Sequence, residues 1–573
     1  MEKIEKIRTA CIAFAKDFYA AITANKKPFA ILLYLVLIHF SECVAYFIGK
    51  LNGSLFNPFL QGVWSWLAIF GLALLCGNIA FKCILTVIIV VQALIAACSS
   101  FLSVVFSLRL RADAFAVLAV SSPEEIKDFY QVFISPLTLI MVACFLGVII
   151  YTIIFLWKSS LKKSRYLYIL AVLLLLPQGI NTFRFCLNGK YENIYKRNSI
   201  APLIKSFIEY RKSDERLKKM AENPELPKNI STNNQENITC VLVIGESANR
   251  FHHSIYGYPR NTSPELSKRR NEMLIFDNVV SGYAHTCQSC SYMFTTQEVN
   301  KKNDFRHSFI DVFKAAGFKI ILLSNQYRWG EFDSPISFMT AHAHERNFLQ
   351  EIKAGSHDDG LYPLFCRAID SNDQRKLIIL HLLGSHHNYA KRYPAEEGVF
   401  NADNRIKNIP YRVDKEHYID DYDNSILFTD KLLGKLCTAL SQRNEPAFML
   451  YVSDHGEFPE QVKSTPRSGA STHLEHYEIP FVLYANKQYR NQFAALWTDA
   501  GKNTNRLFMT DWLMYPFYSA AGITFDDFPE NKNLFSDSYE PPAKVFLGDS
   551  SRQYIHRENP YLNSNSNTAP AKK

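Results

Sequence analysis

The chain has 573 residues, which is too long for one ordinary domain. Its net charge is +9, but no stripe of basic residues with interleaved aromatic rings is present, so a nucleic-acid partner is not expected. The mean hydropathy of −0.08 conceals a strongly apolar first third, and many basic residues flank its apolar runs. A membrane surface therefore explains the charge better than nucleic acid does.

Five apolar runs in the first third predict membrane-spanning helices, because a span needs about 20 apolar residues. The second and fifth are near the lower limit of length. The first is not a cleavable signal peptide, since it is long, lacks a small-residue cleavage site and is followed by further runs. We therefore predict a transmembrane domain over 1–183, with spans at 28–48, 63–80, 83–108, 132–157 and 166–183.

The flanking charges predict how these spans are oriented. Six basic residues precede the first run, and the connection before the fifth run contains only basic charges, namely Lys158, Lys162, Lys163 and Arg165. The positive-inside rule then puts the N-terminus and this connection in the cytoplasm. Five crossings put everything after about residue 184 on the outer side.

A bridging segment over 184–238 is expected to join the membrane domain to the rest. Residues 201–220, "APLIKSFIEYRKSDERLKKM", predict a helix with one apolar face and many basic residues. An interfacial helix on anionic lipid and a solvated linker helix both fit this pattern. Residues 221–238 are polar, contain two prolines and predict a linker. The tail over 556–573 is expected to be disordered.

The remaining segment, 239–555, alternates strand-like and helix-like patterns. Continuous apolar strands separated by helices predict an α/β domain whose largely parallel sheet is covered by helices on both faces. A helical pattern at 422–441 illustrates the intervening elements. The predicted strands lie at 240–245, 319–324, 376–383, 447–453 and 479–485.

Polar residues that could carry chemistry follow three of these strands, immediately after two of them and after a Gly-Ser pair in the third. They are Glu246, the pair His386 and His387, and the pair Asp454 and His455. Functional groups of such sheets gather at the carboxyl ends of the strands, so these side chains are expected at one rim. Carboxylate oxygens and imidazole nitrogens suit zinc, and the ligand set does not exclude manganese.

A candidate nucleophile lies between the first two strands, in "VSGYAHTCQSCSYMF". The segment offers Thr286, Ser289, Ser291 and two cysteines, and spacing alone does not choose among them. Cys287 and Cys290 are the favoured pair if the domain has a disulfide, although sequence cannot fix the connectivity.

These motifs together resemble the lipopolysaccharide phosphoethanolamine transferases, which belong to the alkaline-phosphatase and sulfatase-like superfamily. The resemblance rests on the ordered set "VIGESANRFHHSIYGYPRNTSP", "SGYAHTCQSCSYMF", "HLLGSHHNYAKRYP", "YDNSILFTD" and "YVSDHGE". It covers nearly the whole chain. It implies a bacterial inner-membrane enzyme with five N-terminal spans and a periplasmic sulfatase-like catalytic domain.

The resemblance also implies roles for individual residues. Zinc, as one or two ions, would be held by the residues that match the family's ligands: Glu246, Thr286, Asp454 and His455. Thr286 matches the family's nucleophile because it stands forty residues after Glu246 and seven before Met293. Ser289 is the weaker candidate.

Histidines of the family near the phosphate match two further segments of the chain. His386 matches the first of them, with His387 adjacent. The second falls in "STHLEHYEIPF", where the usual following glycine is absent, so His473 and His476 both remain, and His473 is preferred. Lys391 and Arg392 are candidate contacts for acceptor phosphates or a solvated surface pair, and 324–349 is expected on the acceptor side.

The implied reaction moves phosphoethanolamine from phosphatidylethanolamine to Thr286 and then to lipopolysaccharide. Lipid A phosphate, a core sugar and periplasmic glucan are the acceptors used within the family, and a core sugar is preferred. The alternatives are a glycerol-phosphate transferase of the lipoteichoic-acid-synthase type and a non-catalytic lipid-binding membrane protein. A type I sulfatase is disfavoured, because no C/S-x-P/A-x-R motif occurs around 286–295. An added amine on lipid A would weaken binding of cationic peptides.

Overall fold

The computed structural model describes residues 2–48, 56–106, 127, 134, 136–188, 200–232, 237–299, 306–326, 340–413, 415–464, 473–548, 550–552, 554 and 556–562. The chain divides into two compact units. One consists of 1–115 and 129–210, and the other of 116–128 and 211–573. The first is helical and the second contains the predicted sheet.

The helical unit contains one helix at each of the five predicted apolar runs. These are α2 (Lys26–Ile48), α3 (Phe56–Leu75), α4 (Asn78–Phe106), α7 (Pro136–Trp157) and α8 (Arg165–Asn188). Two stretches are long and apolar enough to cross a membrane by length and composition, Lys26–Ala45 and Asn78–Ser103. Within the described residues the other three helices have shorter apolar stretches. The structure thus confirms a helical N-terminal region, while five spans remain a prediction.

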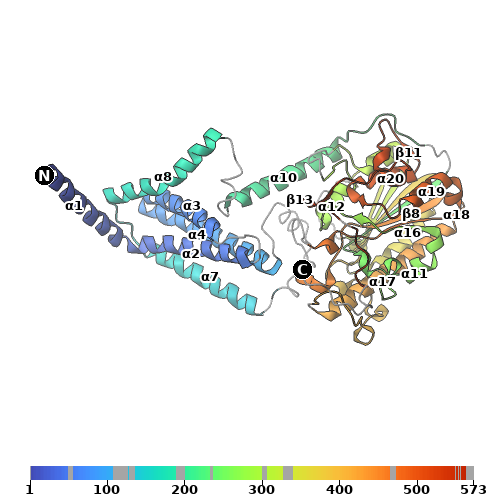
Figure 1. Ribbon diagram of the computed structural model, residues 1–573, viewed down its shortest axis with the longest axis horizontal. Helices are drawn as coiled ribbons and strands as arrows, with labels where there is room; N and C mark the ends of the chain where they lie inside the picture. The colour runs from blue at the N-terminus through green and yellow to red at the C-terminus, as the bar shows by residue number, and fades with distance from the viewer. Residues whose placement is uncertain are drawn as a thin grey trace. The chain divides into compact units, whose positions relative to one another are not determined.

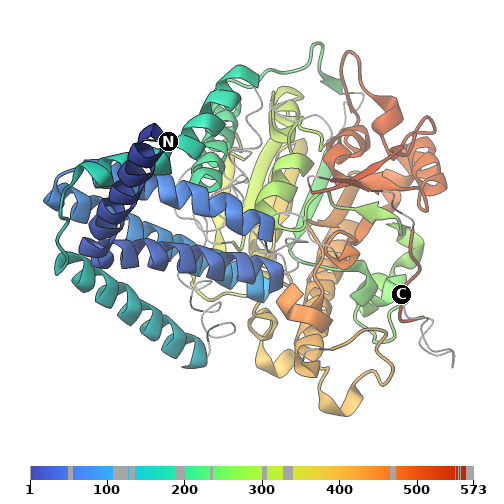
Figure 2. The same ribbon diagram turned by 60° about the vertical axis from the view of Figure 1, so that its left-hand side comes forward.

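Helices α2, α3 and α4 lie side by side (Figure 2). Aromatic side chains contribute to the core between them. The rings of Phe29 and Phe70 lie 5.4 Å apart, and Phe70 meets Phe81 edge-on at 5.8 Å. Gly71 faces α8, where an added Cβ would lie 2.9 Å from the carbonyl oxygen of Ala171. The apolar runs therefore bury a core of their own, as well as offering apolar surface outward.

Helix α1 (Glu2–Ala24) covers the basic N-terminal stretch, for which no helix was predicted. Its Phe14 meets Tyr166 of α8 edge-on at 5.4 Å, and the Tyr166 hydroxyl donates to Asp17 at 2.6 Å. Helix α10 (Ile200–Glu222) confirms the helix predicted over 201–220. Its last turn buries Leu217 and Met220 in the core of the globular unit, a contact that neither interpretation of the segment included.

The globular unit is built on a seven-stranded sheet in the order β3-β9-β8-β2-β7-β5-β6. Strand β9 pairs antiparallel with both β8 and β3, and the other pairings are parallel. The expected largely parallel sheet is thus present, but it is mixed. Its strands are β2 (Ile238–Gly245), β3 (Met273–Phe276), β5 (Lys319–Ser324), β6 (Glu345–Phe348), β7 (Arg375–His381), β8 (Ala447–Ser453) and β9 (Phe481–Ala485).

Helices cover both faces of this sheet, as expected (Figure 1). Side chains of β2 alternate between the two cores, with Leu242 on one face and Val243 on the other. The face of Val243 carries α11 (Pro264–Lys268), α16 (Tyr362–Ile369) and α17 (Glu416–Ser441). The face of Leu242 carries α12 (Thr286–Met293), α13 (Phe309–Ala315) and α20 (Met514–Ala520).

Short pairs of strands extend the unit. They are β1 (Ser231–Thr232) with β11 (Ile523–Thr524), β4 (Val279–Val280) with β10 (Phe508–Met509), and β12 (Val545–Leu547) with β13 (Ser550–Arg552). Further α-helices among the described residues of this unit are α15 (Leu349–Ile352), α18 (Lys487–Gln492) and α19 (Ala494–Lys502).

The globular fold continues past the expected boundary at residue 555. Asn559 is buried, and its side chain donates to the carbonyl oxygens of Phe251 and Tyr256 at 3.2 Å each. Tyr561 is fully buried against Tyr258, with ring centroids 4.9 Å apart. A disordered tail from residue 556 is therefore wrong as far as Leu562, because these side chains fill the space beside residues 251–258. The rest of that predicted tail lies outside the described residues.

Candidate active site

The carboxyl ends of the two central strands bring the predicted metal ligands together. Gly245 of β2 pairs with Ser453 of β8, so the next residue on each strand leaves the sheet at the same level. The backbone N–H of Asp454 donates to the carbonyl oxygen of Gly245 at 3.1 Å. Glu246 and Asp454 therefore meet because neighbouring parallel strands end together.

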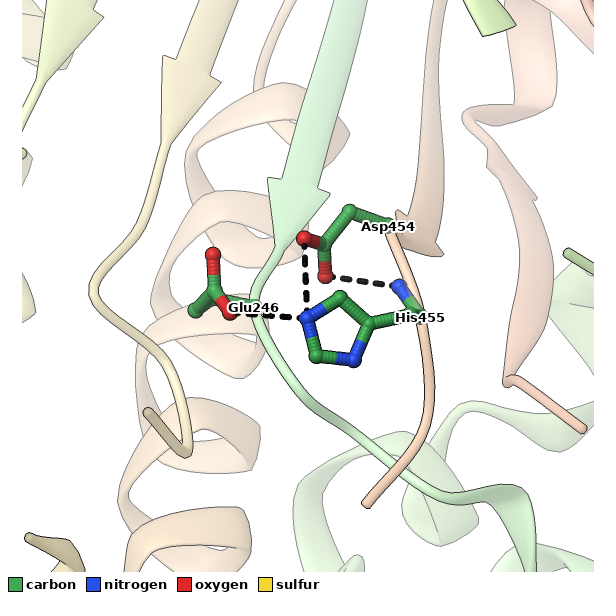
Figure 3. A group of neighbouring side chains, drawn as sticks. All are labelled: Glu246, Asp454 and His455. Carbon is green, nitrogen blue, oxygen red and sulfur yellow. Dashed lines mark hydrogen bonds and ion pairs between the residues drawn. The ribbon is translucent and has the colours of Figure 1, made fainter. Parts of the chain in front are cut away.

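Glu246, Asp454 and His455 form one buried group (Figure 3). The Nε2 atom of His455 lies 3.3 Å from Glu246 Oε1 and 3.5 Å from Asp454 Oδ2. One ligand atom from each residue lies within 4.8 Å of the other two. The structure thus brings three of the four predicted ligands within reach of one ion.

Burial and mutual charge shift the pKa of all three groups. Burial would raise the pKa of Glu246, but the hydrogen bond and charge of His455 outweigh it and lower that pKa well below its usual range. Burial and the Glu246 charge raise the pKa of Asp454 to about 7. Burial would lower the pKa of His455, but the two carboxylates raise it to about 10. The Glu246 and Asp454 carboxylates share His455 as their cationic partner. The three residues can therefore accommodate a further positive charge, such as that of a metal ion.

The donor set fits a divalent metal ion. Asp454 is fully buried, and its Oδ2 atom has no hydrogen-bond partner in the described part of the chain. Its ion pair with His455 Nε2 is long, at 3.5 Å, and a buried carboxylate oxygen without a hydrogen bond is costly unless a cation or a donor comes closer. Two carboxylates and an imidazole are ligands that zinc binds in proteins, and manganese accepts them as well.

Thr286, the fourth predicted ligand, lies beside this group. It is the first residue of α12, and its hydroxyl donates to Glu246 Oε2 at 3.0 Å. Ser289 is fully buried, and its hydroxyl contacts the backbone oxygen of Asp454. The hydroxyl of Ser291 donates to the carbonyl oxygen of Cys287 at 2.7 Å. Of these three hydroxyls, only that of Thr286 touches a side chain of the candidate metal group.

The turn after β2 has an unusual backbone. Ser247 adopts a left-handed conformation with φ 57°, its N–H donates to Asp454 Oδ1 at 3.0 Å, and its hydroxyl donates to Glu246 Oε1 at 2.7 Å. Gly384 packs against this turn with φ +50°, and an added Cβ would lie 2.7 Å from the carbonyl oxygen of Glu246. Asp358 holds Gly384 by accepting from its N–H at 2.8 Å. The Glu246 carboxylate is thus fixed from the strand, the turn and the neighbouring loop.

The predicted histidines lie in two loops near the group. His386 is half-buried, its Nδ1 lies 2.9 Å from the carbonyl oxygen of His387, and its charge contributes to the lowered pKa of Glu246. His387 is buried beside Tyr389, with ring centroids 5.2 Å apart. The loop after β7 therefore brings His386 towards the group and packs His387 inward.

The two alternative histidines, His473 and His476, differ in environment. His476 is fully buried, and its Nε2 lies 3.3 Å from Glu457 Oε1. His473 is half-buried, with its ring 5.2 Å from that of Phe458. An added Cβ on Gly456 would lie 2.2 Å from the carbonyl oxygen of Glu475, so this segment packs directly against the loop after β8.

The predicted acceptor residues, Lys391 and Arg392, lie at the end of a short 3-10 helix, Tyr389–Lys391. Lys391 is exposed and Arg392 half-buried, and both follow the His386 loop in a short turn. The Nε of Arg392 is 3.4 Å from the carbonyl oxygen of Asn388. Half of the predicted acceptor segment 324–349, namely 327–339, lies outside the described residues.

The pairing of Cys287 with Cys290, which the sequence favours if the domain has a disulfide, is not made, because neither cysteine takes part in a disulfide bond. Cys290 is buried in the core beneath the sheet, whereas Cys287 lies on the half-exposed side of the same helix. The two thiols therefore lie in different environments, on different sides of α12.

Three side chains near the group had no sequence assignment. Glu457 pairs with His476 and could have been found as the acid that follows the Asp–His pair in "SDHGE". His285 and His381 are buried near Glu246, and burial lowers the pKa of each to about 4. Both are therefore neutral imidazoles at neutral pH, and no motif marks either one.

Comparisons with known proteins agree with this architecture. The Sulfatase family matches residues 238–543, more than half of the chain. Phosphoethanolamine transferase EptC of Escherichia coli is 27% identical over 416 residues, covering 67% of this chain and 70% of that protein. Phosphoethanolamine transferase EptA of Helicobacter pylori is 30% identical over 383 residues, covering 64% of this chain and 69% of that protein.

Two solved structures share the fold. The C-terminal periplasmic domain of EptC from Escherichia coli, solved in complex with zinc, is 25% identical with a TM-score of 0.50, covering 56% of this chain and 92% of that one. The integral membrane lipooligosaccharide phosphoethanolamine transferase A from Neisseria meningitidis is 18% identical with a TM-score of 0.64. That match covers 90% of this chain and 99% of the other, so the fold is shared across both units.

Proposed function

We propose that this chain, which belongs to the sulfatase family and, within it, to the phosphoethanolamine transferases, moves phosphoethanolamine from phosphatidylethanolamine to a lipopolysaccharide acceptor. The observation that carries the proposal is the Thr286 hydroxyl, which donates to Glu246 beside Asp454 and His455. A hydroxyl held against such a group suits an enzyme that forms a covalent intermediate.

Glu246, Asp454 and His455, with Thr286, would hold a zinc ion, and manganese would suit the same donors. The zinc complex of the related EptC domain supports this assignment. When bound, a divalent ion lowers the pKa of a nearby hydroxyl and offsets phosphoryl charge. His386 and His473 are the candidates for a second ion or for the phosphate. Of the two alternatives His473 is the more accessible, because His476 is buried against Glu457.

In the first half-reaction the Thr286 oxygen attacks phosphorus, a new oxygen–phosphorus bond forms, and the bond to the diacylglycerol oxygen breaks. Glu246 Oε2 accepts the hydrogen bond of the hydroxyl and so orients the oxygen, and the proton that Thr286 loses ends on the departing diacylglycerol oxygen. Thr286 is also the first residue of α12, so the positive end of that helix faces the incoming phosphate.

In the second half-reaction an acceptor hydroxyl or phosphate oxygen attacks the same phosphorus. The bond to Thr286 breaks, and the proton lost by the acceptor returns to Thr286. Since the two lipids react in turn, one site serves both, and neither needs to be present with the other. Lys391 and Arg392 are candidates for contact with acceptor phosphates. A core sugar is the preferred acceptor, and lipid A phosphate and periplasmic glucan are the alternatives.

The helical unit supports a location in the bacterial inner membrane. Two stretches qualify as spans by length and composition, and three further helices lie at predicted runs. We infer five spans, a cytoplasmic N-terminus and a periplasmic globular unit from the basic residues around the first and fifth helices. The donor lipid would then be available in the outer leaflet of that membrane.

The test uses the full-length protein in detergent with phosphatidylethanolamine that carries a fluorescent acyl chain. Wild type should release fluorescent diacylglycerol and gain a phosphoethanolamine adduct by intact mass. Thr286→Ala should do neither, whereas Ser291→Ala, a hydroxyl deletion on the same helix, should behave as wild type. A folded, metal-loaded wild type that shows neither release nor adduct would refute the proposal.

A further inference from the structure

His285 is a buried side chain that the proposed reaction has not yet used. It is 6% exposed, and neither Nδ1 nor Nε2 has a hydrogen-bond partner in the described part of the chain. Buried polar groups in folded proteins are nearly always hydrogen-bonded, and one without a partner calls for an explanation. Leaving such a group unpaired destabilises the folded state.

The position of His285 links this ring to the nucleophile. It is the N-cap residue of α12 with an extended backbone, and Thr286 follows it directly. Its carbonyl oxygen accepts the Ser289 N–H at 3.1 Å, which fixes the backbone at this point. The ring lies within electrostatic range of both His455 and Glu246, so it shares their surroundings.

Neighbouring side chains among the described residues do not supply hydrogen-bond partners for the two ring nitrogens of His285. Gln288, one turn along α12, is close enough for its side chain to raise the pKa of His285, but neither ring nitrogen meets the geometry of a hydrogen bond with it, and its own buried Oε1 has no hydrogen-bond partner among the described residues. His285 is not a member of the group Glu246, Asp454 and His455 whose ligand atoms lie within 4.8 Å of one another. The ring is therefore neither bonded to its neighbour nor part of the candidate ligand set.

We propose that His285 is a further catalytic residue, whose ring N–H donates a hydrogen bond to a phosphoryl oxygen of the group that Thr286 attacks. The inference rests on the proposed function. An imidazole has at least one N–H in either protonation state, so the donor is always present. A donor fixed in a dry site, aimed at an oxygen that gains charge during the reaction, is the arrangement that stabilises such transition states.

The test compares variants that differ in the donor. His285→Gln keeps an N–H on a flexible chain of similar length, and His285→Met replaces it with an apolar one of similar volume. We expect His285→Met to slow formation of the Thr286 adduct by about 100-fold or more, the usual effect of losing one such donor. His285→Gln should recover at least a tenth of the wild-type rate.

His253→Met is the matched control. His253 is also buried with an unpartnered Nε2, but its Nδ1 lies 3.4 Å from Ser263 Oγ, and it is not adjacent to Thr286. Its variant should keep the wild-type rate. A second measurement avoids turnover: O-phosphoethanolamine should raise the melting temperature of wild type and His285→Gln more than that of His285→Met.

The possible results of these measurements separate a failure of the His285 inference from a failure of the proposed function. Equal adduct rates and equal melting shifts for His285→Met and wild type would show that the ring only packs or binds water, and would overturn the inference while leaving the proposed function intact. A wild type that forms no adduct would overturn both. A slow His285→Met that His285→Gln does not rescue, with both variants folded, would also count against a donor role.

Discussion

The Thr286 hydroxyl donates a hydrogen bond to Glu246 Oε2 at 3.0 Å, although forty residues separate the two in sequence. Glu246 ends the central strand β2, and Thr286 begins α12. The same carboxylate meets His455 through its other oxygen at 3.3 Å. Glu246 therefore connects the candidate nucleophile to the candidate metal group. A substitution in the metal group should affect Thr286, and a substitution of Thr286 should affect the metal group.

Metal removal should destabilise the globular unit, because two buried carboxylates would then lack a divalent partner. For a metal at 100 times its Kd the expected loss is about 2.7 kcal/mol. Asp454→Asn should remove most of this response, since it deletes a candidate ligand. Thermal unfolding with zinc and with a chelator measures both effects.

A matched control for that experiment is Asp430→Asn. Asp430 is buried and accepts the N–H groups of Glu265 and Leu266 at 2.7 and 3.0 Å, away from the metal group. The variant should unfold at a lower temperature yet keep the full response to chelator. Identical wild-type curves with zinc and with chelator would contradict the metal assignment.

Gly384→Ala should disable the site through the backbone. The new Cβ would lie 2.7 Å from the Glu246 carbonyl oxygen and 2.8 Å from its nitrogen, and neither backbone atom can move without shifting the carboxylate. We expect a loss of about 2–4 kcal/mol in unfolding free energy, as for overpacking combined with backbone strain. The rate of Thr286 adduct formation should fall by at least the factor that corresponds to this loss of unfolding free energy.

Gly355→Ala separates the two contributions to that loss. Gly355 also has a positive φ, +76°, but an added Cβ would meet nothing within 4 Å. This variant should show only the conformational cost, about 1 kcal/mol, and normal adduct formation. Equal effects of the two substitutions would mean that the contact with Glu246 does not matter.

Much of this architecture could be predicted because the relevant signals are local. The apolar runs that became β2, β5, β7 and β8 are long and bounded, and the polar residues after them mark the carboxyl ends of strands. The reversed direction of β9 could not be predicted, since an apolar run is compatible with either direction. Strands β3 and β6 were missed because each has only four residues, with partly exposed side chains.

The site itself could be predicted only in part. Glu246, Asp454 and His455 follow strands directly, so topology alone brings them together. The contribution of the C-terminal segment could not be foreseen, because "RQYIHRENPYLN" has no periodicity and only its tertiary contacts order it. His285 was missed for a similar reason, since a single histidine before a threonine carries no pattern.

Arg557 makes that C-terminal contribution testable. Its guanidinium reaches both Glu475, at 3.0 Å, and the fully buried Glu478, on either side of His476. Arg557→Met should cost about 3 kcal/mol in unfolding free energy, because it leaves buried carboxylates without their main cation. Arg557→Lys keeps the charge but not the forked geometry, so it should recover part of the loss. Urea unfolding of wild type, Arg557→Lys and Arg557→Met should show stability decreasing in that order. An Arg557→Met variant that unfolds at the wild-type midpoint would contradict the prediction.

His252 should make stability fall at alkaline pH. The ring is buried between Asp423 and Glu460, at 2.7 and 3.2 Å. Burial alone would lower its pKa, but the two carboxylates outweigh burial and raise the pKa to about 9. Since the unfolded value is about 6.5, the folded state binds the proton more tightly. The stabilisation is complete below about pH 6.5 and is lost as pH rises through about 9.

The corresponding measurement is the free energy of unfolding between pH 7 and 9.5 for wild type and His252→Gln. Wild type should lose up to about 3 kcal/mol across this range, because a folded-state proton is released, and the variant should lose much less. His253→Gln is the control. Burial lowers the pKa of His253 to about 3, so that ring is already neutral in the folded state over the whole range. It should therefore keep the wild-type slope. A wild-type slope for His252→Gln would mean that His252 does not carry the proton and that the loss arises from another titrating group.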